Sequence, residues 1–86
     1  MNNFKFSILT KNGVVYEGNV SKVIVNTING EITILKNHIP LITLASKGRV
    51  LICENDVKIE YIAYQGVLRI NKEEVVLMSD KIENLK

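Results

Sequence analysis

The sequence predicts one all-β domain, folded as two packed antiparallel sheets or as a flattened barrel. Apolar residues alternate with other residues along 4–9 and 57–64, which is the period of a half-buried strand. Asparagine and glycine turn signals interrupt such runs at short intervals. The intervals leave no room for crossover helices, and parallel strands need such crossovers, so the sheets are expected to be antiparallel throughout.

The first half of the chain is expected to form five strands. They cover residues 4–9, 14–17, 20–26, 31–35 and 41–45. Asn12-Gly13 and Asn29-Gly30 are good hairpin turns because both residue types tolerate a positive φ. Pro40 holds Ile39 in an extended conformation and lacks a backbone donor, so 41–45 is expected near a sheet edge or just past a bend.

The second half is expected to add four strands. They cover residues 49–54, 57–64, 67–70 and 75–79, which brings the total to about nine or ten. Helical character is confined to the last residues, which are too few for a stable isolated helix. Residues 1–80 are therefore expected to form the domain, and residues 81–86 a short tail.

Composition and charge argue against several classes of protein. The net charge is only +2 and the lysines are scattered, which does not favour nucleic-acid binding. No apolar run has the roughly 18 residues that cross a bilayer, so direct membrane insertion is not expected. Cys53 and His38 are the only residues of their types, so neither an internal disulfide nor a zinc site is expected.

No constellation of residues points to catalysis. A lone histidine in a polar bend, such as His38, is usually a surface or packing residue. Glu73-Glu74 is best interpreted as a solvated turn, and the glycines stand singly rather than in a phosphate-binding loop. Tyr61 and Tyr64 should lie on opposite strand faces, which gives no base-stacking platform. We expect a non-enzyme without catalytic residues, metals or cofactors.

Several predicted strands are apolar on both faces. Examples are Ile34-Leu35, Leu51-Ile52 and the run Val76-Leu77-Met78. In a two-layered sandwich only the inner face of each sheet is covered by the other sheet. The outer residues are either covered by loops and strand twist or contact another protein, and both alternatives remain open at this stage.

An ordered series of short motifs resembles one family along nearly the whole chain. The most specific segment is 30–43, where Gly30-Glu31-Ile32 precedes His38 and Pro40-Leu41-Ile42-Thr43. Further motifs are Gly13–Gly18, Gly48-Arg49-Val50, Gly66-Val67-Leu68 and Val75–Asp80. In order and spacing, the set is similar to the epsilon subunit of the F-type ATP synthase.

This resemblance implies a ten-stranded antiparallel β-sandwich, the N-terminal domain of such a subunit. The domain would bind the gamma subunit and the c subunits of the membrane rotor ring, and would act indirectly on the catalytic alpha/beta head. It would couple ion-driven rotation to ATP synthesis without catalysing a reaction itself. Its place would be peripheral, on the cytoplasmic face of the energy-transducing membrane of a bacterium or an organelle.

The resemblance also suggests partner-binding residues. Glu31 is expected to contact the ring, and His38 to contact gamma, with Lys36 and Asn37 in the same bend. By their positions in the family pattern, Glu31 and the bend 36–38 are expected in one loop region, at the ring-facing and gamma-facing end of the domain.

The chain departs from the family pattern at three places. Lys36-Asn37 stands where many relatives have Pro-Gly, and Tyr64-Gln65-Gly66 where relatives often have Ser-Gly-Gly. The family usually continues into a C-terminal helical hairpin, whereas this sequence ends at Lys86. The restraint of rotation and the ATP binding that the hairpin provides are therefore not expected, whether the chain is a short natural form or one domain of a longer protein.

Two other functions remain as alternatives. One is a small β-barrel that binds nucleic acid or protein. The other is a small enzyme with chemistry around His38.

Overall fold

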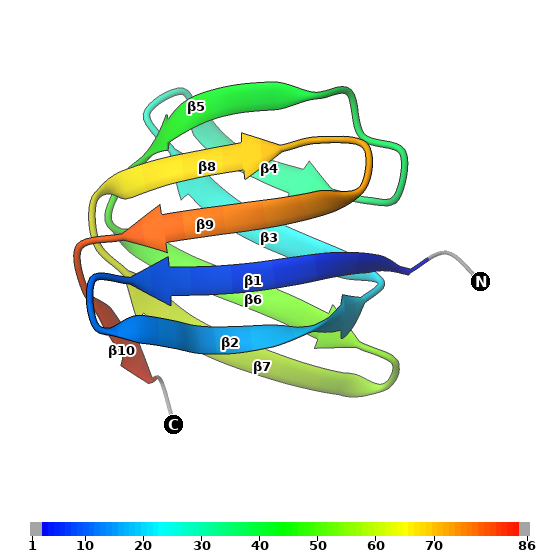
Figure 1. The fold of residues 1–86 in the computed structure, drawn as a ribbon, viewed down its shortest axis with the longest axis horizontal. Helices are drawn as coiled ribbons and strands as arrows, with labels where there is room; N and C mark the ends of the chain where they lie inside the picture. The colour runs from blue at the N-terminus through cyan, green and yellow to red at the C-terminus, as the bar shows by residue number, and fades with distance from the viewer. Residues whose placement is uncertain (1–2, 85–86) are drawn as a thin grey trace.

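The computed structural model describes residues 3–84 and contains ten strands and no helix in that range (Figure 1). The strands are β1 (Phe4–Thr10), β2 (Gly13–Val20), β3 (Lys22–Thr27), β4 (Gly30–Ile34), β5 (Leu41–Ala45), β6 (Gly48–Glu54), β7 (Val57–Ala63), β8 (Gly66–Ile70), β9 (Glu74–Ser79) and β10 (Ile82–Asn84). The all-β, ten-stranded prediction is confirmed. The described residues hold no helix that could cross a membrane.

The strands form one strongly curled sheet that folds back on itself as a flattened barrel. Their order is β10-β7-β6-β3-β5-β8-β9-β1-β2, and β4 pairs with β3 outside this path. In Figure 1, β8, β9, β1 and β2 lie in front of β3, β4 and β6. Gly13 and Gly30 have φ values of 120° and 109°, so both predicted Asn-Gly turns use the conformation that glycine permits.

One pair of strands differs from the expectation of a fully antiparallel sheet. β1 and β9 are parallel, in a register that runs from Lys5 opposite Glu74 to Leu9 opposite Met78. Figure 1 shows both arrowheads pointing the same way. The expectation was wrong here because the crossover argument applies to strands close in sequence, whereas β1 and β9 are joined by most of the chain.

The sandwich also extends past the predicted boundary at residue 80. Ile82–Asn84 form β10, which pairs with Tyr61–Ala63 of β7, and Ile82 packs against the core. These three residues form a strand because β7 pairs with them and the core covers Ile82. A local sequence pattern does not show such contacts with a distant segment. The rest of the predicted tail, residues 85 and 86, lies outside the described residues.

The core consists of the inward-facing residues of both layers. Its largest fully buried side chains come from seven of the ten strands: Phe6, Ile8, Val20, Val23, Val25, Ile34, Val50, Ile52, Leu68 and Leu77. Burial of each such side chain stabilises the fold by about 1.5–3 kcal/mol relative to its exposed state. The core therefore holds the two layers together.

Tyr16 connects β2 to the opposite layer, where no backbone ladder joins them. Its hydroxyl donates a 2.8 Å hydrogen bond to the Glu54 carboxylate, and its ring contacts those of Phe6 and Tyr61. A Cβ on Gly18 would come within 2.7 Å of this hydroxyl, so the glycine leaves room for it. Burial of the phenol, together with the Glu54 hydrogen bond, raises the pKa of Tyr16 well above its usual range.

Tyr16→Phe is expected to lower the free energy of unfolding by about 1–3 kcal/mol, because Glu54 loses a donor while the ring contacts remain. The contribution of the neutral phenol is complete below the unfolded tyrosine pKa of about 10, and it is lost as the pH rises towards the higher folded pKa. The wild type should therefore lose more stability than the variant above pH 10. Urea unfolding between pH 7 and 11 measures both effects, and equal stability with equal alkaline slopes would contradict them.

Gly66→Ala is expected to destabilise the fold by about 1–3 kcal/mol or more, because its Cβ would overlap the backbone carbonyl oxygen of Met78. Gly48→Ala is the matched control: its Cβ would meet only the Asn26 side chain, at 2.9 Å, and that side chain can move. Thermal unfolding of both variants tests the difference. A smaller loss for Gly66→Ala than for Gly48→Ala would show that this interpretation of the close approach is wrong.

Candidate partner-binding surfaces

The turns gather at two opposite ends of the barrel because strand directions alternate along the chain. One end, named here the Glu31 end, holds the turns at 11–12, 28–29, 46–47, 64–65 and 80–81. The other, named the His38 end, holds the connections at 21, 35–40, 55–56 and 71–73. Each predicted partner-binding residue lies at one of these ends.

The predicted residues are not in one loop region. Glu31 is at the start of β4, whereas Lys36, Asn37 and His38 follow its last residue. The five residue steps from Glu31 to Lys36, at about 3.3 Å each, separate them by roughly 16 Å. The expected single region was wrong because Glu31–Ile34 is a fully paired strand that spans one layer from end to end.

At the Glu31 end, charged and polar side chains are held by backbone contacts. Glu31 is exposed and pairs with Asn26 across the β3–β4 ladder, and the Asn26 amide donates to the Lys47 carbonyl at 3.1 Å. Glu31 also lines a small hollow with Ile24, Arg49 and Leu51. This end therefore presents a carboxylate on an ordered strand rather than on a loose loop.

Tyr64 stands between two cations at the same end. Its ring centroid lies 4.8 Å from Lys47 Nζ and 5.1 Å from Lys81 Nζ. The Ser79 hydroxyl orders these turns, since it accepts a 3.1 Å bond from the Tyr64 N–H and donates a 2.9 Å bond to the Lys81 carbonyl. Tyr61 instead packs partly buried against the core, which confirms that the two tyrosines do not form one platform.

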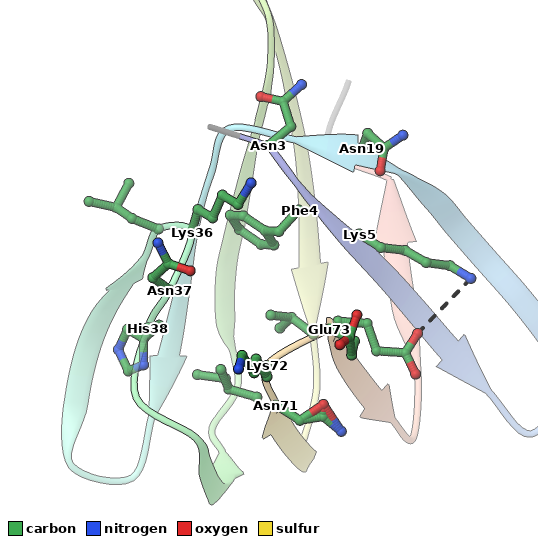
Figure 2. A pocket seen from close by; sticks show the side chains of 14 residues that line it. Asn3, Phe4, Lys5, Asn19, Lys36, Asn37, His38, Asn71, Lys72 and Glu73 are labelled. Atoms are coloured by element: carbon green, nitrogen blue, oxygen red, sulfur yellow. Dashed lines mark ion pairs between the residues drawn. The ribbon is translucent and has the colours of Figure 1, made fainter. Parts of the chain in front are cut away.

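The His38 end contains a cavity of about 300 Å³, shown in Figure 2. Phe4 lies in its middle, and Lys36 and Asn37 lie on one side with Lys72 and Glu73 facing them. The cavity brings together three of the four predicted site residues, but not Glu31. Its lining is polar around a small apolar centre.

The bend that carries His38 is fixed by its own backbone. Asn37 has a φ of 70°, a left-handed conformation that asparagine tolerates, and the His38 N–H donates to the Leu35 carbonyl at 3.2 Å. The His38 ring donates from Nδ1 to the Ile39 carbonyl at 2.8 Å. This bond ties the imidazole to the backbone of the next residue.

The described residues show little that could assemble reactive chemistry. Within 3–84, no three His, Cys, Asp or Glu side chains come close enough to hold a metal ion, and every buried side-chain nitrogen or oxygen has a partner. Cys53 is buried in β6 as a free thiol. Lys5 is engaged by Glu17 at 3.1 Å and by Glu74 at 4.0 Å, the latter drawn in Figure 2.

An apolar surface crosses the outer face of four strands. The β5–β8, β8–β9 and β9–β1 registers place Leu44, Val67, Met78 and Leu9 in one row. Leu44 is 54% exposed and Met78 41%, while the next residue along each strand, Ala45 or Ser79, is buried. We call this row, with the neighbouring Ile42, the apolar face.

The sequence pointed to part of the apolar face. Met78 lies in a strand that was recognised as apolar on both faces, although its neighbour Val76 is buried rather than exposed. The contributions of Ile42 and Leu44 were missed. The signal for them is the uncharged run from Ile39 to Ala45, in which Ile39 and Ile42 are the two most exposed large apolar residues described.

Comparisons of sequence identify relatives with one common name. Residues 3–85 match the family described as "ATP synthase, Delta/Epsilon chain, beta-sandwich domain". The ATP synthase epsilon chain of Clostridium acetobutylicum is 35% identical over 83 residues, which are 95% of this chain and 62% of the relative. The ATP synthase epsilon chain of Persephonella marina is 32% identical over 80 residues, which are 91% of this chain and 58% of the relative. The chain thus spans less than two thirds of the length of these relatives.

Comparisons of structure agree on the fold. A chain in the Euglena gracilis mitochondrial ATP synthase, solved as an OSCP/F1/c-ring assembly, matches with a TM-score of 0.89 and 14% identity, over 95% of this chain and 53% of that one. A chain in the Tetrahymena thermophila mitochondrial ATP synthase central stalk/c-ring matches with a TM-score of 0.80 and 11% identity. The match covers 94% of this chain and 66% of that one. With the family match across residues 3–85, this fold shows that the chain belongs to the ATP synthase delta/epsilon family, as its β-sandwich domain.

Proposed function

We propose that the chain acts as a coupling subunit in the central stalk of a rotary F-type ATP synthase, where it joins the gamma subunit to the c subunits of the rotor ring. The apolar face is the observation that carries this proposal, because exposed rows of large apolar residues mark protein interfaces. The relatives are named ATP synthase epsilon chain, so the partner of the apolar face is expected among the other subunits of the ATP synthase. The role is mechanical and acts on the alpha/beta head only through gamma.

Gamma is assigned to the apolar face, whose row lies close to the turns of the Glu31 end, and to the His38 end, which β5 connects to that face. His38 is followed directly by Ile39 and Pro40, which lead into β5 of the apolar face. Ile39 is 77% exposed and extends the apolar surface towards the bend. An interface core of large apolar residues with a rim of Lys36, Asn37 and His38 has the usual anatomy of a protein–protein contact.

The rotor ring is assigned to the Glu31 end. This end presents Glu31 near the start of β4, and Lys47 and Lys81 on turns held by side-chain hydrogen bonds to their carbonyls, which suits contact with polar loops. The apolar face is on the outside of β5, β8, β9 and β1, whereas Glu31 is on β4 in the layer behind them (Figure 1), so gamma and the ring can be bound at the same time. Such a subunit would be peripheral, at the cytoplasmic face of the energy-transducing membrane, and held there by its partners.

Met78→Glu is expected to weaken binding of the cognate gamma subunit about tenfold or more, because it places a carboxylate inside an apolar interface. Val57→Glu is the matched control, since Val57 is 58% exposed on β7, away from the apolar face. Calorimetric titration with purified gamma measures both affinities, and thermal unfolding confirms that both variants fold. Equal affinities for the two variants would exclude the apolar face as the gamma site.

Glu31→Lys is expected to reduce recovery of c subunits when the tagged chain is retrieved from detergent-solubilised membranes, while recovery of gamma is maintained. Glu73→Lys makes the same charge change at an exposed residue of the opposite end and should leave the recovery of c subunits intact. Mass spectrometry of the retrieved proteins gives the ratio of c subunits to gamma. A loss of c subunits with Glu73→Lys but not with Glu31→Lys would reverse the assignment of the ends.

A further inference from the structure

β5 is fully paired on one side only. All five of its residues pair with β8, from Leu41 opposite Ile70 to Ala45 opposite Gly66. On its other side, the described residues supply a single pair, Thr27 with Ala45. β5 lies along the upper rim of the barrel in Figure 1, and the edge from Pro40 to Leu44 has no neighbouring strand within residues 3–84.

The direction of the backbone groups on this edge follows from one hydrogen bond. The Ile28 N–H donates to the Leu44 carbonyl at 3.1 Å, from the side of β5 that faces away from β8. Backbone groups of alternate residues point to the same side of a strand. The N–H and carbonyl of Ile42 therefore also point away from β8. The ladder on this side consists of the Ser46–Asn26 and Ile28–Leu44 bonds and stops at Leu44.

This edge begins at Pro40 but lacks the charged side chains that exposed edges usually carry. Native edge strands are commonly guarded by charged side chains. The other strands with an open edge each contain a carboxylate, at Glu17 in β2, Glu31 in β4 and Glu83 in β10. β5 has no charged residue, and Ile42 is 69% exposed. Six of the ten exposed large apolar residues in the described chain lie between residues 28 and 44.

We infer that an extended segment of gamma adds to β5 as a further strand, bonded to the backbone of Ile42 and Leu44. The inference rests on the proposed function, since gamma is the partner assigned to the adjoining apolar face. Backbone pairing would supply the register, and apolar side chains of the added strand would cover the hollow that Ile42 forms with Arg69 and Asn71. Gamma would then continue the sheet as well as pack against it.

A second copy of this chain fits the edge less well. Two copies could pair their β5 strands antiparallel, with Ile42 opposite Ile42. Lys36, which precedes β5 in one copy, would then approach Lys47 and Arg49, which follow β5 in the other copy. Such like charges oppose association. The edge also continues directly into the His38 bend and the apolar face, which are the surfaces assigned to gamma.

The test compares Ile42→Pro with Ile42→Ala. Both remove the isoleucine side chain, but only proline also removes the N–H, and proline is tolerated on the open side of an edge strand. If gamma adds a strand, Ile42→Pro should bind gamma about tenfold more weakly than Ile42→Ala, because a carbonyl of gamma loses its donor. Equal affinities for the two variants would overturn strand addition and leave gamma binding in place. Failure of the wild-type chain to bind gamma would overturn the proposed function itself.

Amide hydrogen exchange on the wild-type chain gives a second readout that does not depend on the variant folding. Binding of gamma should slow exchange at Ile42 and Leu44 at least tenfold, and leave Val14 of the β2 edge unchanged. Unchanged exchange at Ile42 in the complex would overturn the inference. So would sedimentation showing a stable dimer of the chain that gamma does not dissociate, because a second copy would then occupy the edge.

Discussion

The parallel pairing of β1 with β9 is the constraint on which the rest of the structure depends. It is the sole backbone ladder that attaches the β1–β2 hairpin to the other described strands. The same register places Phe6 and Ile8 inside the core and brings Leu9 beside Met78 on the outside. One set of hydrogen bonds thus fixes the position of the hairpin and completes the apolar face.

The molecule separates its surfaces by chemistry. Charged and hydrogen-bonded turns occupy the Glu31 end, a polar cavity occupies the His38 end, and the apolar face lies on the outside of one layer, nearer the Glu31 end. A body with a continuous buried core resists deformation because any displacement of one strand disturbs the packing of its neighbours. Such a body suits the proposed mechanical role, which requires shape and stiffness rather than a reactive group.

Backbone hydrogen bonds do not close the barrel completely. The two open seams, between β2 and β6 and beside β5, differ in their contacts. Between β2 and β6, a side-chain contact from Tyr16 to Glu54 replaces a backbone ladder, and Gly18 leaves space for it. Beside β5 no comparable contact closes the edge within the described residues, and the side chains there are apolar and exposed. An exposed edge of this composition is a hazard for aggregation unless a partner covers it. The contrast supports a structural role for the first seam and a binding role for the second.

Local patterns in the sequence determined which residues form strands, where the Asn-Gly turns fall and which family the chain resembles. These features depend on alternation, on the φ freedom of single residues and on motif order, all of which are readable along the chain. The partners of each strand are not readable in this way, because pairing between distant segments is decided by which arrangement buries both inner faces at once. Hence the parallel β1–β9 pair and the addition of β10 emerged only from the tertiary structure.

The same division holds for the candidate sites. The sequence, through its family resemblance, predicts Glu31, Lys36, Asn37 and His38 as partner-binding residues, and by itself it shows no catalytic set. Only the tertiary structure decided that Glu31 and His38 lie at opposite ends, because the strand between them must span a whole layer. It also decided that one edge of β5 stays open, since the β3–β4 turn pairs with its last residues alone.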